Sequence, residues 1–336
     1  MTEPVEAAPD ELAFVKGHGT RNDFVLVADL DGRLDLTPDL VRRLADRRAG
    51  VGADGVVRLV PSSRLPEGAA VLAEDPAAVW FMDYRNADGS VAEMCGNGVR
   101  VFAAFAELLD LVDLSDGSTL SVGTRAGVKR VVREPNGWYA VDMGPWTFPG
   151  GDDAVARGAD AQVAVHGWRA ARPALSVDLG NPHTVVALAD ATELEGLDLT
   201  VAPQVHPVPP HGTNVELVVP LGEQGGSADD AGAKVGRVRM RVFERGVGET
   251  ESCGTGTCAA ALAVRAWAGP GAPDTWLVDV PGGTLRVRAL PGGRVELAGP
   301  AVLAYAGRFP LVGGPDAPAL VEPIAAHLTA GAPAAP

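Results

Sequence analysis

Hydrophobic positions along this chain gather in short runs rich in β-branched residues, separated by turns that contain glycine, proline or asparagine. Runs of this length and composition predict β-strands. We expect strands at Phe24–Ala28, Val56–Val60, Leu120–Val122, Val128–Val132, Val141–Met143, Val185–Leu188, Val215–Val219, Val238–Val242, Trp276–Val280 and Leu285–Val287.

Helical periodicity is convincing in three segments, Pro38–Arg48, Val99–Leu109 and Thr257–Trp267. Several strand pairs flank a glycine-containing turn, as at Val280–Leu285, which favours antiparallel meanders. Strands that follow one another with few helices between them predict an α+β fold, not a doubly wound parallel sheet.

The remaining segments are polar or low in complexity. Pro61–Ala78 and Leu221–Gly236 lie between predicted strands and indicate inserted loops. Residues 1–12 and 314–336 are biased toward alanine, proline and glycine, so we expect tails with little order there.

Polar landmarks recur at matched spacing in the two halves of the chain. Gly55 follows Asn22 by 33 residues, and Asn214 follows Asn181 by 33. Matched spacing predicts two copies of one structural unit, with chance alignment in a glycine-rich chain as the alternative.

The spacing continues to a cysteine in each half. Asn86 precedes Cys95 by nine residues, and Glu244 precedes Cys253 by nine. A Gly-x-Gly turn and an apolar helical pattern follow each cysteine. Two facing copies of one unit would place the two thiols across a cleft, the usual place for a small-ligand site.

Composition limits the class of protein. The 336 residues are 46% hydrophobic, enough for a substantial core, and the net charge is −15. Nucleic acid and anionic membranes are therefore excluded as partners, because both require a cationic face. The N-terminus lacks the pattern of a secretory signal, and three cysteines are too few for a disulfide scaffold. We expect a cytoplasmic protein with a small-molecule substrate.

A thiol at the start of a helix lies beside unpaired backbone N–H groups, which can lower its pKa from about 8.5 to about 3.5–7.5. The same N–H groups can hold a substrate carboxylate and the charge that develops when an α-proton leaves. Inverting a stereocentre requires a base on one face and an acid on the other. Cys95 and Cys253, one ionised and one protonated, meet that requirement without a cofactor.

Each reading has an alternative. A cysteine is often only a small buried apolar residue, and Cys258 fits that description. Cys253 and Cys258 have a C-x4-C spacing, but no second pair supports zinc, and a Cys95–Cys253 disulfide would be an inactivated state. The glycines lack the dinucleotide-binding spacing. Pyridoxal phosphate requires a Schiff-base lysine and is disfavoured in a chain with three lysines.

The motifs closely resemble those of the diaminopimelate epimerase family. The matching segments span about residues 14 to 310 and are Lys16–Phe24, Val51–Gly55, Tyr84–Ser90, Met94–Arg100, Gly180–His183 and Glu244–Gly256. The resemblance implies inversion of LL- to meso-2,6-diaminopimelate, on the route to lysine and peptidoglycan, by a homodimer without cofactor or metal.

The resemblance also implies an architecture. Two pseudo-symmetric domains would each wrap a β-barrel-like sheet around a central helix, with the site between them. We expect domains at 13–144 and 145–299, a strand at 300–313 that returns to the first domain, and tails at 1–12 and 314–336.

Site residues carry over by position. The catalytic thiols match Cys95 and Cys253, with His183 and Glu244 in support. The implied substrate-binding residues are Asn22, Asn86, Gly96, Asn97, Asn181, Asn214, Glu244, Arg245, Gly254 and Thr255. Gly55 departs from the family, whose members often have a polar side chain such as glutamine there.

The polar set suits a substrate with an amino acid at each end. Arg245 offers a planar fork for the distal carboxylate, and Glu244 can accept from an ammonium. The alternatives are a turn role for Asn86 and a surface ion pair for Arg245. Competing functions are a proline or hydroxyproline racemase, which would not need the distal contacts, and a binding protein that has lost activity.

Overall fold

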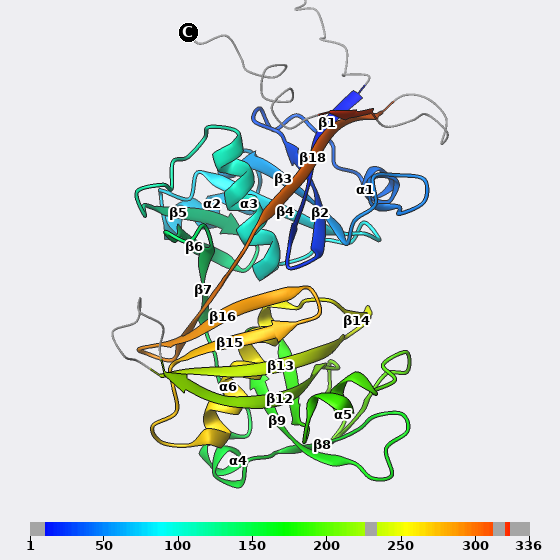
Figure 1. Ribbon diagram of the computed structural model, residues 1–336. Helices are drawn as coiled ribbons and strands as arrows, with labels where there is room; N and C mark the ends of the chain where they lie inside the picture. The colour runs from blue at the N-terminus through cyan, green and yellow to red at the C-terminus, as the bar shows by residue number, and fades with distance from the viewer. Residues whose placement is uncertain (1–10, 226–233, 312–319, 323–336) are drawn as a thin grey trace, which may run out of the picture.

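The computed structural model describes residues 11–225, 234–311 and 320–322, and the short apolar runs of the sequence form its strands (Figure 1). All ten predicted strands and all three predicted helices overlap observed elements, and the α+β prediction is confirmed. The first part of the chain contains β1 (Glu11–Gly19), β2 (Asn22–Ala28), α1 (Pro38–Ala45), β3 (Gly55–Pro61), η1 (Ser62–Arg64), α2 (Gly68–Glu74), β4 (Trp80–Asn86), α3 (Gly96–Leu108), β5 (Thr119–Thr124), β6 (Gly127–Arg133) and β7 (Tyr139–Pro145).

A second series of elements follows and is again dominated by strands. It contains α4 (Gly151–Arg157), β8 (Ala161–Ala164), β9 (Arg172–Asp178), β10 (Pro182–Ala187), α5 (Ala191–Glu195), β11 (Gln204–His206), β12 (Asn214–Gly225), β13 (Lys234–Glu244), β14 (Gly248–Thr250), α6 (Gly254–Ala268), β15 (Thr275–Val280), β16 (Gly283–Leu290), β17 (Arg294–Gly299), β18 (Val302–Pro310) and β19 (Leu320–Glu322). We call residues 11–145 the first repeat and residues 172–299 the second repeat.

The strand registers of the two repeats coincide around the landmark residues. Phe24 on β2 pairs in parallel with Gly55 on β3, and His183 on β10 pairs in parallel with Asn214 on β12. Each pair lies at the same distance from Asn22 or Asn181 along the chain. Because register fixes which side chains share a face, the repeat read from spacing is a repeat of structure.

The outer hairpins of the two repeats also pair in matching register. Val122 pairs with Lys129 across the β5–β6 hairpin, and Val278 pairs with Leu285 across the β15–β16 hairpin. In the next hairpin Val131 pairs with Val141, and in the second repeat Val287 pairs with Leu297.

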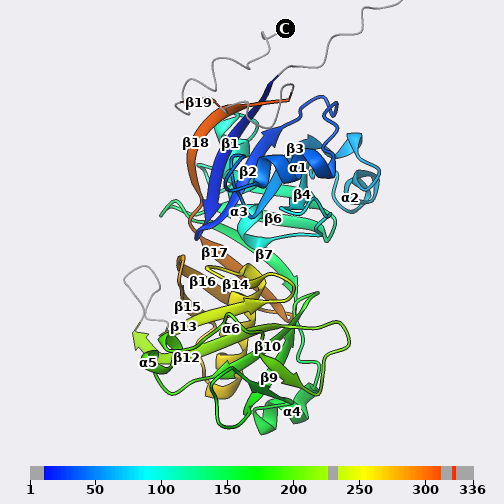
Figure 2. The same cartoon turned by 90° about the vertical axis from the view of Figure 1, so that its right-hand side faces the viewer.

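Strands exchange between the repeats at two crossings. β7 and β17 pair antiparallel with each other and pass between the upper and lower halves of the molecule (Figures 1 and 2). Beyond β17, the chain enters β18, which pairs antiparallel with β1 of the first repeat. The expected domain boundaries remain a prediction, since the sheet is continuous through β7 and β17.

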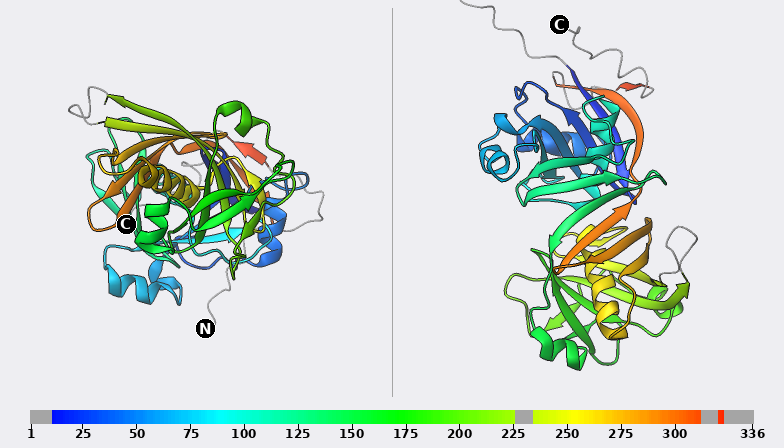
Figure 3. Two further views of the ribbon diagram at one scale, coloured as in Figure 1. Left: turned by 90° about the horizontal axis from the view of Figure 1, so that it is seen from below. Right: turned by 90° about the vertical axis from the view of Figure 1, so that its left-hand side faces the viewer.

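Each repeat encloses one long helix. In α6, residues 256–264 are all buried, and strands of the second repeat surround the helix (Figure 3). In α3, residues 96–106 are all buried. Small side chains such as Ala259, Ala260 and Ala261 let strands approach α6 closely on several sides, which is why this helix shows no polar face.

Two predicted loops are partly wrong. Pro61–Ala78 contains η1 and α2, because Val71 on α2 packs against Val60, Ala78 and Phe81. In Leu221–Gly236 the described residues, 221–225 and 234–236, are strand, because β12 and β13 extend into the segment and pair down to Gly225 and Lys234. Residues 226–233 lie outside the described residues.

The predicted tails are shorter than expected. Glu11 and Leu12 belong to β1 and pair with Pro310 and Phe309 on β18. Residues 320–322 form β19, also on β18, and the rest of both tails lies outside the described residues. Within residues 11–225, 234–311 and 320–322, no helix is long and apolar enough to cross a membrane.

Candidate active site

Each long helix begins directly after one of the predicted thiols. Cys95 and Cys253 are the N-cap residues of α3 and α6, and both have extended backbone with φ of −141° and −118°. The first N–H groups of a helix have no partner within the helix, so both thiols lie beside backbone donors that the helix itself leaves unpaired. At Cys253 the sulfur itself accepts from the Gly256 N–H, at 3.4 Å.

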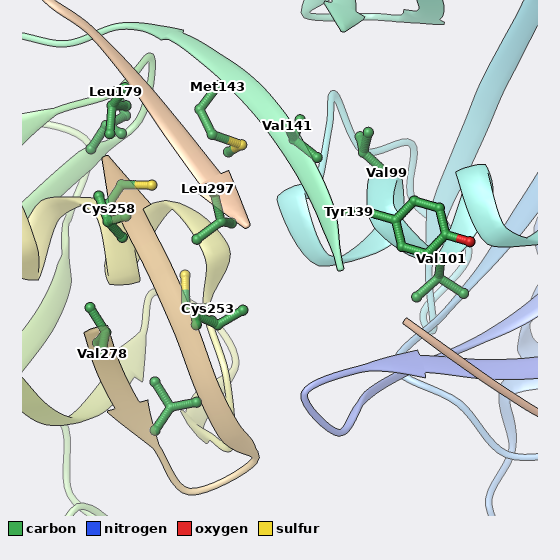
Figure 4. Packing of buried hydrophobic residues seen from close by; sticks show 14 of the residues in the cluster. Val99, Val101, Tyr139, Val141, Met143, Leu179, Cys253, Cys258, Val278 and Leu297 are labelled. Carbon is green, nitrogen blue, oxygen red and sulfur yellow. The ribbon is translucent and has the colours of Figure 1, made fainter. Parts of the chain in front are cut away.

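The two helices meet start to start. A Cβ atom built on Gly254 would lie 3.3 Å from the Cα of Gly96. Met143 on β7 and Leu297 on β17 cover this junction: a Cβ on Gly96 would lie 2.9 Å from Met143 Cε and 3.1 Å from Leu297 Cδ2 (Figure 4). Glycine at both positions therefore lets the positive ends of two helix dipoles face one small region.

Amides surround the half-buried Cys95. Its thiol donates to Asn22 Oδ1 at 3.4 Å, and Asn97 Nδ2 donates to the same oxygen at 3.2 Å. The buried Asn97 also donates to Ser252 O at 3.2 Å, next to the second thiol in the chain. One asparagine side chain thus joins the surroundings of both cysteines.

The β1–β2 turn also reaches from the first repeat to the second. Thr20 and Arg21 form a two-residue turn with φ of +49° and +64°, a conformation that normally selects glycine or asparagine. Thr20 Oγ1 lies 2.7 Å from Ser252 Oγ. Backbone strain at a site is a common sign of function, and here it places a hydroxyl at the junction.

A different set of groups surrounds the buried Cys253. The Thr255 hydroxyl lies 3.7 Å from its sulfur, and Asn181 Nδ2 donates to that hydroxyl at 3.2 Å. His183 contacts Asn181 Oδ1 through its ring nitrogen Nε2. Its other ring nitrogen, Nδ1, lies 2.7 Å from Glu216 Oε1. His183 and Glu216 are fully buried.

Glu244, at the end of β13, also faces this thiol. It accepts a hydrogen bond from the Thr250 hydroxyl, and a hydrogen bond with Cys253 counteracts the effect of its burial. Burial raises the pKa of the Glu244 carboxyl. A raised pKa favours the protonated form of this carboxyl beside the thiol.

Burial has the largest effect on the pKa of both thiols. It raises the pKa of Cys95 to about 11, against the lowering by the N–H groups of Gly98 and Asn97. Burial also raises the pKa of Cys253 well above its usual range, and the charges of Glu244 and Glu216 add to that rise. The expected lowering by the helix starts is therefore wrong for the protein without substrate, because desolvation of the thiolates outweighs it.

Some predicted site residues have hydrogen-bond partners away from the two thiols. Asn86 Nδ2 donates to Ser90 Oγ at 3.0 Å within its own turn, as the turn alternative states. The exposed Arg245 directs its guanidinium to the carbonyl of His211. Asn214 is buried and accepts from the Arg245 backbone N–H at 2.9 Å, so it fixes the start of the Arg245 turn.

The departure at Gly55 has a steric explanation. A Cβ on Gly55 would lie 2.6 Å from Cε2 of Tyr84 and 2.5 Å from the carbonyl oxygen of Arg85. The buried Tyr84 ring fills the space that a side chain at Gly55 would need and packs edge-on against Phe24.

Cys258 is fully buried, one turn beyond Cys253 in the apolar interior around α6 (Figure 4). Within the part of the chain that the structure describes, no three or more His, Cys, Asp or Glu side chains are arranged to hold a metal ion.

Sequence reasoning missed four residues at this site. Glu216 and Ser252 contact the predicted residues His183 and Asn97. Thr20 contacts Ser252, and Arg100 in turn donates to Thr20. Only Glu216 carried a signal, because it is an acid inside the apolar run from Val215 to Val219, where a carboxyl must have a buried partner.

Several known proteins are similar in sequence to this chain over most of its length. A diaminopimelate epimerase of Streptomyces coelicolor is 46% identical over 305 residues, covering 89% of this chain and 95% of that protein. Diaminopimelate epimerases of Thermobifida fusca and Corynebacterium glutamicum strain R are 45% and 44% identical, each covering 88% of this chain and 97% of the relative.

Solved structures share the fold at low identity. A Bacillus anthracis phenazine biosynthesis protein of the PhzF family has a TM-score of 0.57 at 14% identity, covering 89% of this chain and 99% of that chain. An Agrobacterium vitis hydroxyproline epimerase has a TM-score of 0.55 at 16% identity, covering 91% and 94%.

The family model described as diaminopimelate epimerase matches residues 14–149 and 175–303, which include both cysteines, both long helices and all of the predicted site residues. Together with relatives that are about 45% identical over most of their length, this match establishes that the chain belongs to the diaminopimelate epimerase family.

Proposed function

We propose that this protein is an isomerase that converts LL-2,6-diaminopimelate to meso-diaminopimelate, on the route to lysine and peptidoglycan precursors. The observation that carries the proposal is that Cys95 and Cys253 begin two helices whose first glycines, Gly96 and Gly254, meet. Family membership supports the reaction, and the opposed helix starts support how this chain performs it.

The chemistry consists of two proton transfers. One thiolate removes the α-proton, and the electron pair of the broken C–H bond moves toward the substrate carboxylate. Backbone N–H groups at Gly96, Asn97, Gly254 and Thr255 face the developing negative charge and stabilise it. The other thiol delivers its proton to the opposite face, which inverts the centre and leaves the two cysteines with exchanged protonation states.

The distal end of the substrate is assigned to the second repeat. Arg245 would leave the His211 carbonyl and bind the distal carboxylate through two parallel hydrogen bonds. Asn22, Asn86, Asn181, Asn214 and Glu244 supply the remaining contacts, with His183 in support of Cys253. The exposed position of Arg245 supports this assignment, because a solvent-exposed guanidinium held by one backbone carbonyl can turn toward a ligand at little cost.

We further propose that the reaction needs neither cofactor nor metal and that the protein acts as a cytoplasmic homodimer. The two thiols already supply the acid and the base, and the net charge of −15 disfavours nucleic acid and membrane surfaces. Light scattering coupled to size-exclusion chromatography tests the dimer, which predicts about twice the chain mass of 34.5 kDa.

Exchange in deuterated water tests the reaction. The protein is incubated separately with LL-diaminopimelate and with L-proline, and deuterium at the α-carbon is followed by NMR. We expect deuterium at one α-carbon of diaminopimelate together with formation of the meso isomer, and none in proline. Exchange of proline alone would instead favour a racemase of cyclic amino acids, and exchange of neither would favour a binding protein.

A further inference from the structure

A continuous line of polar groups leads from the interior of the second repeat to the Cys253 thiol. It begins at Glu216 on β12, whose Oε1 lies 2.7 Å from Nδ1 of His183 on β10. Both side chains are fully buried, so neither can exchange this contact for water.

The line continues toward α6. His183 Nε2 lies 3.2 Å from Asn181 Oδ1, and Asn181 Nδ2 donates to Thr255 Oγ1 at 3.2 Å. The Thr255 hydroxyl ends the line, 3.7 Å from Cys253 Sγ. Four contacts therefore join a buried carboxyl to a catalytic sulfur.

The direction of these hydrogen bonds follows from what each group can offer. With Asn181 Nδ2 donating to Thr255, the amide oxygen of Asn181 faces His183 and can only accept, so His183 Nε2 must carry a proton. The other ring nitrogen then shares a proton with Glu216 Oε1. Because Thr255 Oγ1 accepts from Asn181, its own proton is free to point at Cys253 Sγ, so the donors from His183 Nε2 onward all face the sulfur.

Gly256 shows how tightly Glu216 is packed under the start of α6. A Cβ on Gly256 would lie 2.6 Å from Glu216 Oε1 and 3.3 Å from Cys253 Sγ. The carboxyl and the sulfur therefore lie near the same point, and the glycine leaves room for both.

The first repeat has no such line. The positions that match His183 and Glu216 in strand register are Phe24 and Val57, both apolar and buried. Since the two repeats share their register, the polar pair is a special feature of the Cys253 side and not a requirement of the fold.

We propose that Glu216 is a positioning residue that acts through His183 and Asn181 to point the Thr255 hydroxyl at Cys253 and so stabilises its thiolate. The inference deepens the proposed function, on which the role of Cys253 as a base rests. The groups of the second repeat that face this thiol are Glu244 from β13, Glu216 from β12 and His183 from β10.

The proposal and simple charge repulsion predict opposite results when Glu216 is removed. The negative charges of Glu216 and Glu244 oppose a thiolate at Cys253, whereas the Thr255 hydroxyl favours it. If Glu216 acted only through its charge, removing it would make Cys253 more reactive. If Glu216 acts through the line of hydrogen bonds, removing it makes Cys253 less reactive.

The test measures alkylation of each cysteine by iodoacetamide at pH 8.5 in the full chain, by mass spectrometry and without diaminopimelate. The rate at each site follows its thiolate fraction, and Cys95 in the same sample is the internal reference. We expect Glu216→Met, which keeps the size of the side chain but cannot hydrogen-bond to His183, to slow alkylation of Cys253 at least threefold. Glu216→Gln, whose amide still bonds to Nδ1, is expected to stay within twofold of the unmodified chain.

An unchanged or faster rate in Glu216→Met would overturn the proposal, as would an equal loss in Glu216→Gln. Because no substrate is present, these results do not depend on whether the protein epimerises diaminopimelate, and failure of the exchange experiment would leave them interpretable.

A second pair of variants avoids the buried carboxyl altogether, in case Glu216→Met does not fold. Thr255→Val removes the hydroxyl from the half-buried start of α6, and we expect about tenfold slower alkylation of Cys253. Thr255→Ser keeps the hydroxyl and should restore the rate. Equal rates in Thr255→Val and Thr255→Ser would show that the hydroxyl does not stabilise the thiolate.

Discussion

The two thiol sites share one backbone register and differ in the charges around the sulfur. Five residues after each cysteine the first repeat has Arg100 and the second has Cys258, and both side chains are fully buried. Arg100 lowers the pKa of the Cys95 thiol against its burial. The charge of Glu244 raises the pKa of both thiols, and Glu216 adds to the rise at Cys253 alone.

This difference teaches that a duplicated fold can supply symmetry of position without symmetry of chemistry. Strand register and helix starts place both sulfurs at the junction, and they depend on backbone pairing that both repeats share. Buried side chains outside the proposed substrate-binding set, Arg100 and Glu216, then distinguish the two sites. Burial raises the pKa of both thiols, to about 11 for Cys95, and only near Cys95 does a buried arginine oppose that rise.

The largest expected effect tests what the two sites share. Cys95→Ser and Cys253→Ser should each reduce net inversion of diaminopimelate by about 10²–10⁴-fold, because a hydroxyl is a far weaker acid and base than a thiol. Circular dichroism or coupled assay of meso product measures the rate. A single variant that kept a near-normal rate would show that two thiols are not needed.

A second prediction tests a residue that only the second repeat possesses. The position that matches Arg245 in the first repeat is Ala87, one residue after Asn86 as Arg245 is one after Glu244. Arg245→Lys replaces a two-pronged contact by a point charge, and we expect KM for diaminopimelate to rise about tenfold with a smaller change in kcat. An unchanged KM would remove Arg245 from the distal contact.

A third prediction tests the charge difference directly. Alkylation of Cys95 should rise with pH up to about 11, because the thiolate reacts and burial has raised the pKa of this thiol. Arg100→Met removes the neighbouring positive charge and should slow alkylation of Cys95 severalfold at pH 8.5, with Cys253 in the same sample as the reference. Equal slowing at both cysteines would indicate a general structural change instead.

The smallest expected effect concerns a matched pair of glycines, Gly98 and Gly256, each three residues after a cysteine. A Cβ on Gly256 would lie 2.6 Å from the buried Glu216 Oε1, whereas a Cβ on Gly98 meets nothing closer than 3.5 Å. We expect Gly256→Ala to cost about 1–3 kcal/mol of unfolding free energy and Gly98→Ala to gain about 0.5–1 kcal/mol. Thermal unfolding compares them, and a lower Tm for Gly98→Ala than for Gly256→Ala would reverse the comparison.

Much of the secondary structure could be predicted from the sequence, because it depends on the local pattern of apolar and polar residues. Runs such as Val215–Val219 are too apolar and β-branched to be exposed, and they form strands. The α2 helix could not be predicted, because Gly68–Glu74 is short and its buried Val71 packs against Val60 and Phe81, which lie on the neighbouring strands β3 and β4. Strand β18 likewise acquires its place only by pairing with β1, at the other end of the chain.

By itself the sequence determined the two thiols and the repeat that relates them, because Gly-flanked cysteines and matched spacings can be read along the chain. Only the tertiary structure decided their chemical surroundings. Glu216 on β12 lies close to Cys253, and Ser252 of the second repeat contacts Asn97, beside Cys95 in the first. Burial raises the pKa of both thiols where the helix starts alone would lower it. Desolvation and charge depend on what packs around a group, and packing brings together residues that no local pattern connects.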